Sequence, residues 1–183
     1  FAVGQSGERV GVRELVAVGL GRQRVAQTQV QLDGVDGLDQ EVRGAEFERQ
    51  VTALAHKAYK PTEIGAAIAS GSFPAMGMIV IPCSIKTLSG IANSYADDLI
   101  VRAADVTLKE GRPLVLVVRE TPLHRGHLRL MDLAARAGAV IFPPVPAFYH
   151  RPATIDDLVD HTVARALQRL GLPDAGVTPW QGL

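Results

Sequence analysis

The sequence is poor in cysteine and in long apolar runs, and it carries no excess of either charge. Cys83 is the single cysteine, so an intrachain disulfide is excluded, and we expect a protein of the reducing cytoplasm. The 19 basic and 19 acidic side chains cancel, which argues against a nucleic-acid partner. No apolar run approaches the roughly 20 residues that a bilayer-spanning helix needs, so no membrane span is predicted.

The sequence also lacks a convincing set of metal ligands. His124 and His127 are three residues apart, yet no cysteine or carboxylate accompanies them at the spacing of a zinc site. We therefore predict no metal. Cys83 follows an apolar run without an adjacent histidine, so we interpret it as a small packed hydrophobe rather than a nucleophile.

From residue 75 onward, short apolar runs alternate with segments of helical spacing, which is typical of an α/β fold with a parallel sheet. The apolar runs predict strands at residues 77–81, 113–118 and 139–142. Apolar residues at helical spacing predict helices at residues 88–104 and 128–137. The length of the chain is that of one domain, which we expect to cover residues 1–183.

The two ends of the chain differ in how clearly their elements are marked. Thr154 and Asp157 have the spacing of a capping box, and the apolar helix face that follows ends at Gly171. The opening third has no strong apolar run. Within it, residues 12–20 predict a helix and residues 28–32 predict a short strand.

Polar residues follow each of the three predicted strands, where open parallel sheets bind their ligands. After the first strand, residues 84–87 (Ser-Ile-Lys-Thr) open a helix and offer backbone N–H groups to an anion or a flavin edge. Arg119 and Glu120, a cation beside a carboxylate, follow the second strand. A proline-rich segment after the third strand leads to Tyr149. We expect all three places to lie along one edge of the sheet.

Each of these features has a structural alternative. The hydroxyls at residues 84–87 could only cap a helix, and the Arg119–Glu120 pair could be an ordinary pair at a strand end. Tyr149 could simply pack its ring. By composition alone, Lys109 and Glu110 are interpreted as a solvated helix end.

A series of short motifs resembles the UbiX/Pad family of flavin prenyltransferases in order and spacing. The motifs include RAADV at residues 102–106, LKE at 108–110 and RETPL at 119–123. Residues 50–183 match the family pattern, whereas residues 1–49 match it poorly.

The resemblance implies a three-layer flavodoxin-like (Rossmann-like) α/β fold that assembles into a homododecamer with FMN between subunits. The implied reaction joins a dimethylallyl group from dimethylallyl phosphate to N5 and C6 of reduced FMN without a metal. The prenylated FMN then serves a UbiD-type decarboxylase, often in ubiquinone biosynthesis.

The matched positions imply roles for individual side chains. Contacts to FMN are implied for Ser84, Ile85, Lys86, Thr87 and Arg119. A cradle for the prenyl phosphate is implied for Arg102, Lys109, Tyr149 and Arg165, with Glu120 as the acid/base group and Lys109 also catalytic, and Trp180 in an apolar wall. Arginine, lysine and a tyrosine hydroxyl suit this task because they stabilise negative charge on a leaving phosphate.

The opening residues depart from the family pattern. Gly4, Gln5 and Ser6 stand nearest to the family's Gly-Ala-Ser flavin loop, which implies that they contact the cofactor and that Ser6 is catalytic. Gln5 is larger than the residue it replaces and would crowd the flavin phosphate. Glu46 is the nearest candidate for a further catalytic glutamate. We expect residues 1–49 to lack the family's first strand.

Three explanations fit this departure: a truncated or frameshifted gene start, a rebuilt flavin pocket, or a decayed copy of the gene. The leading functional hypothesis is a flavin prenyltransferase. The alternative is an FMN-binding homologue without catalysis. A flavin-dependent decarboxylase of a cysteine peptide shares the fold, but the RAADV and RETPL motifs belong to the prenyl-transfer pattern.

Overall fold

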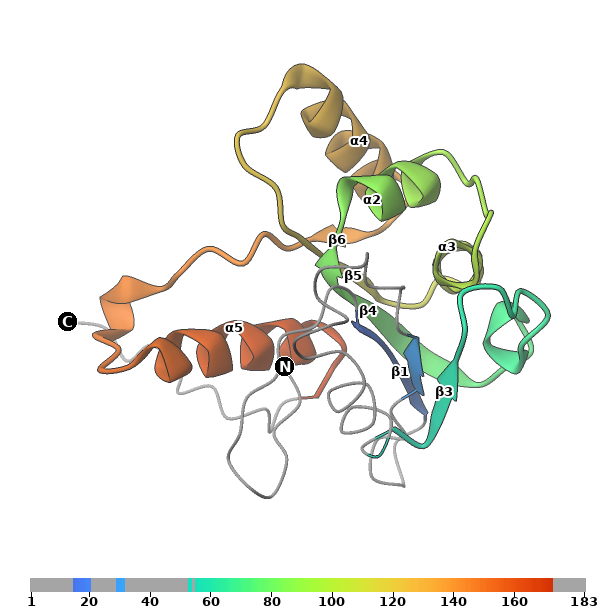
Figure 1. Ribbon diagram of the computed structural model, residues 1–183, viewed down its shortest axis with the longest axis horizontal. Helices are drawn as coiled ribbons and strands as arrows, with labels where there is room; N and C mark the ends of the chain where they lie inside the picture. The colour runs from blue at the N-terminus through green and yellow to red at the C-terminus, as the bar shows by residue number, and fades with distance from the viewer. Residues whose placement is uncertain (1–14, 21–28, 32–52, 54, 173–183) are drawn as a thin grey trace, which may run out of the picture.

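The computed structural model describes residues 15–20, 29–31, 53 and 55–172. These residues form a six-stranded sheet in the order β3-β2-β1-β4-β5-β6 (Figure 1). The strands are β1 (Leu15–Leu20), β2 (Gln29–Gln31), β3 (Lys57–Tyr59), β4 (Ala75–Cys83), β5 (Leu114–Val118) and β6 (Val140–Ile141). The helices are η2 (Ala67–Ala69), α2 (Ile85–Ala92), α3 (Leu99–Lys109), α4 (Arg125–Arg136), η3 (Phe148–His150) and α5 (Ile155–Arg169).

The sheet is parallel except at β1. Strands β4, β5 and β6 pair in parallel, as do β2 and β3. β1 runs antiparallel to both of its neighbours, and its pairing with β4 extends from Leu15 opposite Ile81 to Leu20 opposite Ala75. The predicted parallel α/β sheet is therefore confirmed, with β1 as an exception that the sequence pattern did not indicate.

The prediction of a helix at residues 12–20 is wrong, because residues 15–20 form β1. The segment reads Leu-Val-Ala-Val-Gly-Leu, in which valine favours a strand and glycine disfavours a helix. Its backbone pairing with β4 then decides the structure. The short strand predicted at residues 28–32 is confirmed as β2. The expected absence of the family's first strand stays a prediction, since residues 1–14 lie outside the described residues.

The prediction of one helix over residues 88–104 is also wrong. Two helices, α2 and α3, are separated by a turn at residues 93–98 in which Ser94 has a φ of 51°. Asp98 starts the second helix, because its side chain accepts a hydrogen bond from the backbone N–H of Val101 at 2.8 Å. The apolar spacing continues across the turn, which is why it predicts a single helix.

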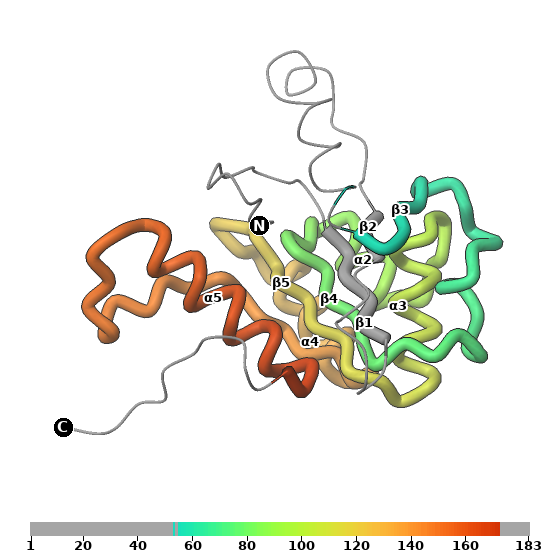
Figure 2. Tube along the Cα trace, turned by 90° about the horizontal axis from the view of Figure 1, so that it is seen from below, coloured from blue at the N-terminus to red at the C-terminus, as the bar shows by residue number. Residues whose placement is uncertain are grey.

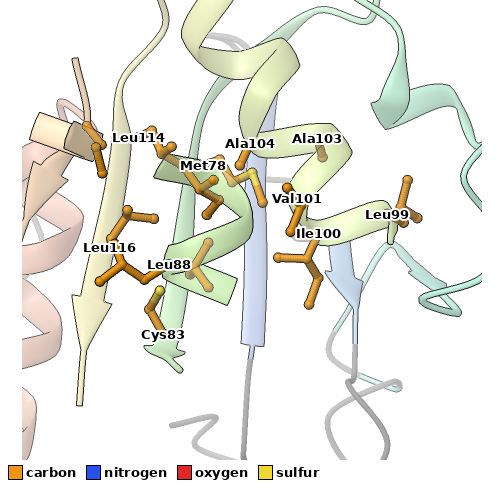
Figure 3. Close-up of a cluster of buried hydrophobic side chains, with 14 of the residues drawn as sticks. Met78, Cys83, Leu88, Leu99, Ile100, Val101, Ala103, Ala104, Leu114 and Leu116 are labelled. Atoms are coloured by element: carbon orange, nitrogen blue, oxygen red, sulfur yellow. The ribbon is translucent and has the colours of Figure 1, made fainter. Parts of the chain in front are cut away.

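Helices cover both faces of the sheet and make three layers. On one face, α2, α3 and α4 enclose the larger core with alternate residues of β4 and β5, among them Met78, Leu114 and Leu116 (Figures 1 and 3). On the other face, Val115 and Val117 pack with Ala166 of α5. Leu114 and Leu116 are fully buried, and removing each from water stabilises the fold by roughly 1.5–3 kcal/mol.

The segment between β6 and α5 extends from the body of the molecule and returns along α5 (Figures 1 and 2). The predicted capping box is confirmed at the start of α5. The hydroxyl of Thr154 accepts from the backbone of Asp157 at 3.1 Å, and the Asp157 carboxylate accepts from the backbone N–H of Thr154 at 2.8 Å. We call residues 143–169 the carboxyl-terminal arm.

Candidate functional site

Residues 84–87 lie where β4 passes into α2. Ser84 is the N-cap of α2, and its hydroxyl accepts from the backbone N–H of Thr87 at 3.2 Å. The two hydroxyl oxygens of Ser84 and Thr87 are 3.1 Å apart, and Thr87 is buried. The capping alternative is therefore observed at Ser84. Ile85 and Lys86 form the first helical turn, whose backbone N–H groups are the natural site for an anion.

Arg119 and Glu120 follow the carboxyl end of β5, next to Ser84 at the carboxyl end of β4. These strand ends form the edge at which ligand binding was predicted. The backbone N–H of Arg119 donates to the carbonyl of Cys83 at 3.2 Å, and Cys83 is paired with Val118 in the sheet. One Glu120 oxygen accepts from the backbone N–H of Thr121 at 3.0 Å. Two of the three places predicted from the sequence thus share one sheet edge.

Tyr149 is not at this edge. It belongs to η3, at the tip of the carboxyl-terminal arm, away from the sheet (Figure 1). Its ring lies 4.2 Å from that of His150 and 6.4 Å, edge-on, from that of His161 of α5, measured between centroids. The expectation that all three places share one edge is therefore wrong for Tyr149 within a single chain, because the proline-rich segment carries it outward.

Arg165 joins this cluster through His161, one helical turn before it on α5. Burial lowers the pKa of the His161 imidazole, and the neighbouring His150 and Arg165 lower it further. The rings of His150 and His161 are 4.3 Å apart. Sequence reasoning missed both histidines, although His150 directly follows Tyr149 and His161 precedes Arg165 by four residues.

Three cations predicted to hold FMN or phosphate have carboxylate partners within the chain. Their closest nitrogen–oxygen distances are 3.8 Å for Lys86–Asp98, 3.8 Å for Arg102–Asp105 and 2.6 Å for Lys109–Glu110. Asp98, Asp105 and Glu110 were not singled out as site residues. Asp105 and Glu110 are within three residues of their basic partners in sequence, which was the available signal. Asp98 is twelve residues from Lys86, and only the fold brings the two side chains together.

Lys109 lies at the opposite end of strand β5 from Glu120. It ends α3, and β5 begins five residues later, whereas Glu120 follows the end of β5. The five residues of β5 span about 17 Å at the usual rise of a strand. A single chain therefore does not bring Lys109 to Glu120.

Two open hollows lie near the predicted site residues. One, of about 540 Å³, lies between α2 and α3 and includes Lys86 and Thr87 in its wall. The other, of about 860 Å³, lies on the carboxyl-terminal arm and includes His150 and His161. Neither wall includes Glu120, so neither hollow on its own is a complete reaction site.

Several predicted residues lie outside the described part of the chain: Gly4, Gln5, Ser6, Glu46 and Trp180. Among the residues that are described, no three His, Cys, Asp or Glu side chains are grouped as metal ligands. The helices within residues 55–172 include none that is long and apolar enough to cross a membrane.

The chain is similar to known flavoproteins. A family model described as Flavoprotein matches residues 23–167. The flavin prenyltransferase UbiX of Escherichia coli K12 is 60% identical over 136 residues, which cover 73% of this chain and 72% of that protein. UbiX of Thauera aromatica is 57% identical over 120 residues, or 66% of this chain and 62% of that protein.

Solved structures show the same likeness. AnUbiX (PadA1), crystallised with FMN and dimethylallyl pyrophosphate, has a TM-score of 0.80 and 46% identity, covering 86% of this chain and 84% of its own. A dodecameric FMN-dependent UbiX-like decarboxylase from Escherichia coli O157:H7 has a TM-score of 0.78 and 48% identity, covering 85% and 84%. The cysteine decarboxylase TvaF shares only 14% identity and shows the fold alone. This chain therefore belongs to the UbiX family of flavin prenyltransferases.

Proposed function

We propose that this chain joins a dimethylallyl group from dimethylallyl phosphate to N5 and C6 of reduced FMN and releases phosphate without a metal. The 60% identity to the UbiX flavin prenyltransferase carries this proposal. AnUbiX, with FMN and dimethylallyl pyrophosphate in its crystal structure, supports both substrate classes. The binding of FMN without turnover is the alternative, because the sequence around Ser6 departs from the family's flavin loop.

The residues at the β4–β5 edge fit FMN. The first turn of α2 offers backbone N–H groups to a phosphate or a flavin oxygen, and Lys86 adds a positive charge to that turn. Arg119 lies beside this turn, since its backbone is hydrogen-bonded to Cys83. Reduced FMN supplies the nucleophilic N5 and C6 atoms when bound.

The roles of the other residues follow from the bonds that break. The allylic C–O bond leaves its electron pair on phosphate, so Arg102, Lys109, Tyr149 and Arg165 would stabilise the growing charge. Glu120 would donate a proton to the leaving phosphate and then accept the proton that leaves flavin C6. The N5 proton moves to the prenyl alkene as the new ring closes, so the protons balance.

The reaction site is assembled from more than one copy of the chain in this proposal. Lys109 and Glu120 lie at opposite ends of β5, and Tyr149 lies on an arm that extends from the body. A homo-oligomer, by likeness to the dodecameric neighbour, would bring these residues together. We also propose that the prenylated FMN serves a UbiD-type decarboxylase and that this chain acts in the cytoplasm.

Anaerobic incubation with reduced FMN and dimethylallyl phosphate, followed by mass spectrometry of the released flavin, tests the activity. We expect a mass gain of one prenyl unit. Glu120→Gln should lower the rate by about 100-fold or more, as loss of an acid/base group does. Unmodified FMN that co-purifies would support the binding-only alternative. Absence of any bound flavin would show that residues 1–49 do not form a working flavin loop.

A further inference from the structure

The end of α3 carries a close ion pair between two consecutive residues. The Nζ of Lys109 donates to Oε1 of Glu110 at 2.6 Å. Neighbouring residues on a helix point in different directions, so both side chains must bend in order to meet. The hydrogen bond from Lys109 and then its charge lower the pKa of the Glu110 carboxyl; burial opposes this, and Arg112 adds a smaller lowering. The carboxylate is thus the charged partner of the ammonium.

A turn from another part of the chain lies against this pair. Arg112 fixes the turn, because Nη1 donates to the carbonyl of Phe73 and Nη2 to the carbonyl of Gly71, both at 2.8 Å. Inside the turn, the Ser70 and Ser72 hydroxyl oxygens are 2.9 Å apart. Arg112, three residues after α3, therefore joins residues 70–73 to the end of α3 in one corner, although about 40 positions separate them in sequence.

A side chain at Gly71 would displace the ends of both members of the ion pair, with Oε1 of Glu110 the nearest atom. A Cβ at this position would lie 2.8 Å from Nζ of Lys109 and 2.8 Å from Cδ of Glu110. The ion pair therefore packs directly on the backbone of the turn. Lys109 remains about half exposed, with a side-chain exposure of 51%, so its other N–H donors can still reach an anion.

We propose that Glu110 is a positioning residue that holds the Lys109 ammonium against the Gly71 turn, ready for the phosphate of the prenyl substrate. This inference rests on the proposed function for the identity of the anion. A free lysine side chain loses rotamer entropy when it is fixed. Glu110 and the turn fix it before the substrate arrives, and one carboxylate leaves two of the three ammonium donors available.

A competing role for Glu110 makes the opposite prediction. A carboxylate that merely occupies Lys109 would have to be displaced by the phosphate, and its removal would tighten substrate binding. A positioning carboxylate weakens binding when it is removed. The direction of the change in KM for dimethylallyl phosphate therefore separates the two roles.

The kinetic test uses the full-length oligomer with Glu110→Ala, Glu110→Asp and Gly71→Ala. We expect Glu110→Ala to raise the KM for dimethylallyl phosphate about tenfold, as the loss of one charge-assisted contact does, while kcat and the KM for FMN change less than about threefold. Glu110→Asp should recover part of the loss. Gly71→Ala should also raise this KM, because only the ends of two flexible side chains oppose its methyl group.

A second measurement does not depend on turnover. The chain has four lysines, Lys57, Lys60, Lys86 and Lys109, so trace acylation followed by peptide mass spectrometry reports each one separately. An ammonium held in an ion pair acylates slowly, and we expect Lys109 to acylate several times faster in Glu110→Ala and Gly71→Ala. Asp132→Asn is the matched control, since it removes an exposed ion pair with Arg136 on α4.

The outcomes separate the two proposals. Unchanged acylation of Lys109 in Glu110→Ala, or a KM for dimethylallyl phosphate that stays the same or falls, would overturn the positioning role. Faster acylation in a protein that never prenylates FMN would uphold the positioning of Lys109 and reject the proposed function. A rise in KM for Asp132→Asn as large as that for Glu110→Ala would show a general effect of surface charge, which also rejects the positioning role.

Discussion

His161 links Tyr149 and Arg165, two residues of the proposed phosphate cradle, and it makes stability depend on pH. Burial and the nearby His150 and Arg165 lower its pKa in the folded chain. Between that pKa and the ordinary value of about 6.5, the unfolded chain binds more protons, so stability falls as the pH is lowered through this window. The carboxylates of Asp157 and Asp160 line the same hollow and do not reverse the shift.

We therefore expect His161→Gln to flatten the loss of stability on acidification. Chemical denaturation of the wild-type chain and the variant at about pH 7.5 and pH 5.5 measures it. The gap in the free energy of unfolding between the two pH values should be smaller in the variant. An equal gap in both proteins would show that His161 is protonated alike in the folded and unfolded states.

Helix α3 depends on Asp98 for its start, and this dependence predicts a measurable cost. Asp98 is buried, caps the helix through Val101 and lies 3.8 Å from Lys86. Asp98→Ala should lower the free energy of unfolding by about 1–2 kcal/mol, while Asp98→Asn should retain most of the cap. The exposed neighbour Asp97→Ala is the control. Equal losses at both positions in equilibrium denaturation would exclude a capping role for Asp98.

The elements that could be predicted correctly are those marked by a pattern of residues that are close together in the sequence. The fully apolar run of β5 and the spacing of Thr154 and Asp157 each indicate one structure by themselves. The turn before Asp98 was missed because apolar residues continue on both sides of it. The corner that holds Lys109 could not be predicted, since Arg112 reaches Gly71 and Phe73 only after the chain has folded.

At the scale of the whole molecule, a site shared between copies predicts complementation. A Lys109→Ala chain and a Glu120→Gln chain should each be nearly inactive alone. Co-expressed in equal amounts, they should recover activity at about a quarter of the sites, those that take Glu120 from one chain and Lys109 from the other. The rate of FMN prenylation by mixed oligomers measures this. Activity no greater than the sum of the separate variants would place both residues in one chain's site.

The placement of Lys109 and Glu120 at opposite ends of β5 also decides which subunit loses activity when one chain is damaged. In a shared site, a subunit that loses Lys109 still supplies Glu120 to one site, but the site that needs its Lys109 together with a neighbour's Glu120 becomes inactive. Chemical damage to one chain would thus stop the reaction at a site that uses the Glu120 of another chain. If the site is shared as proposed, a newly made chain would be inactive until it assembles with others, and the activity per chain would fall on dilution.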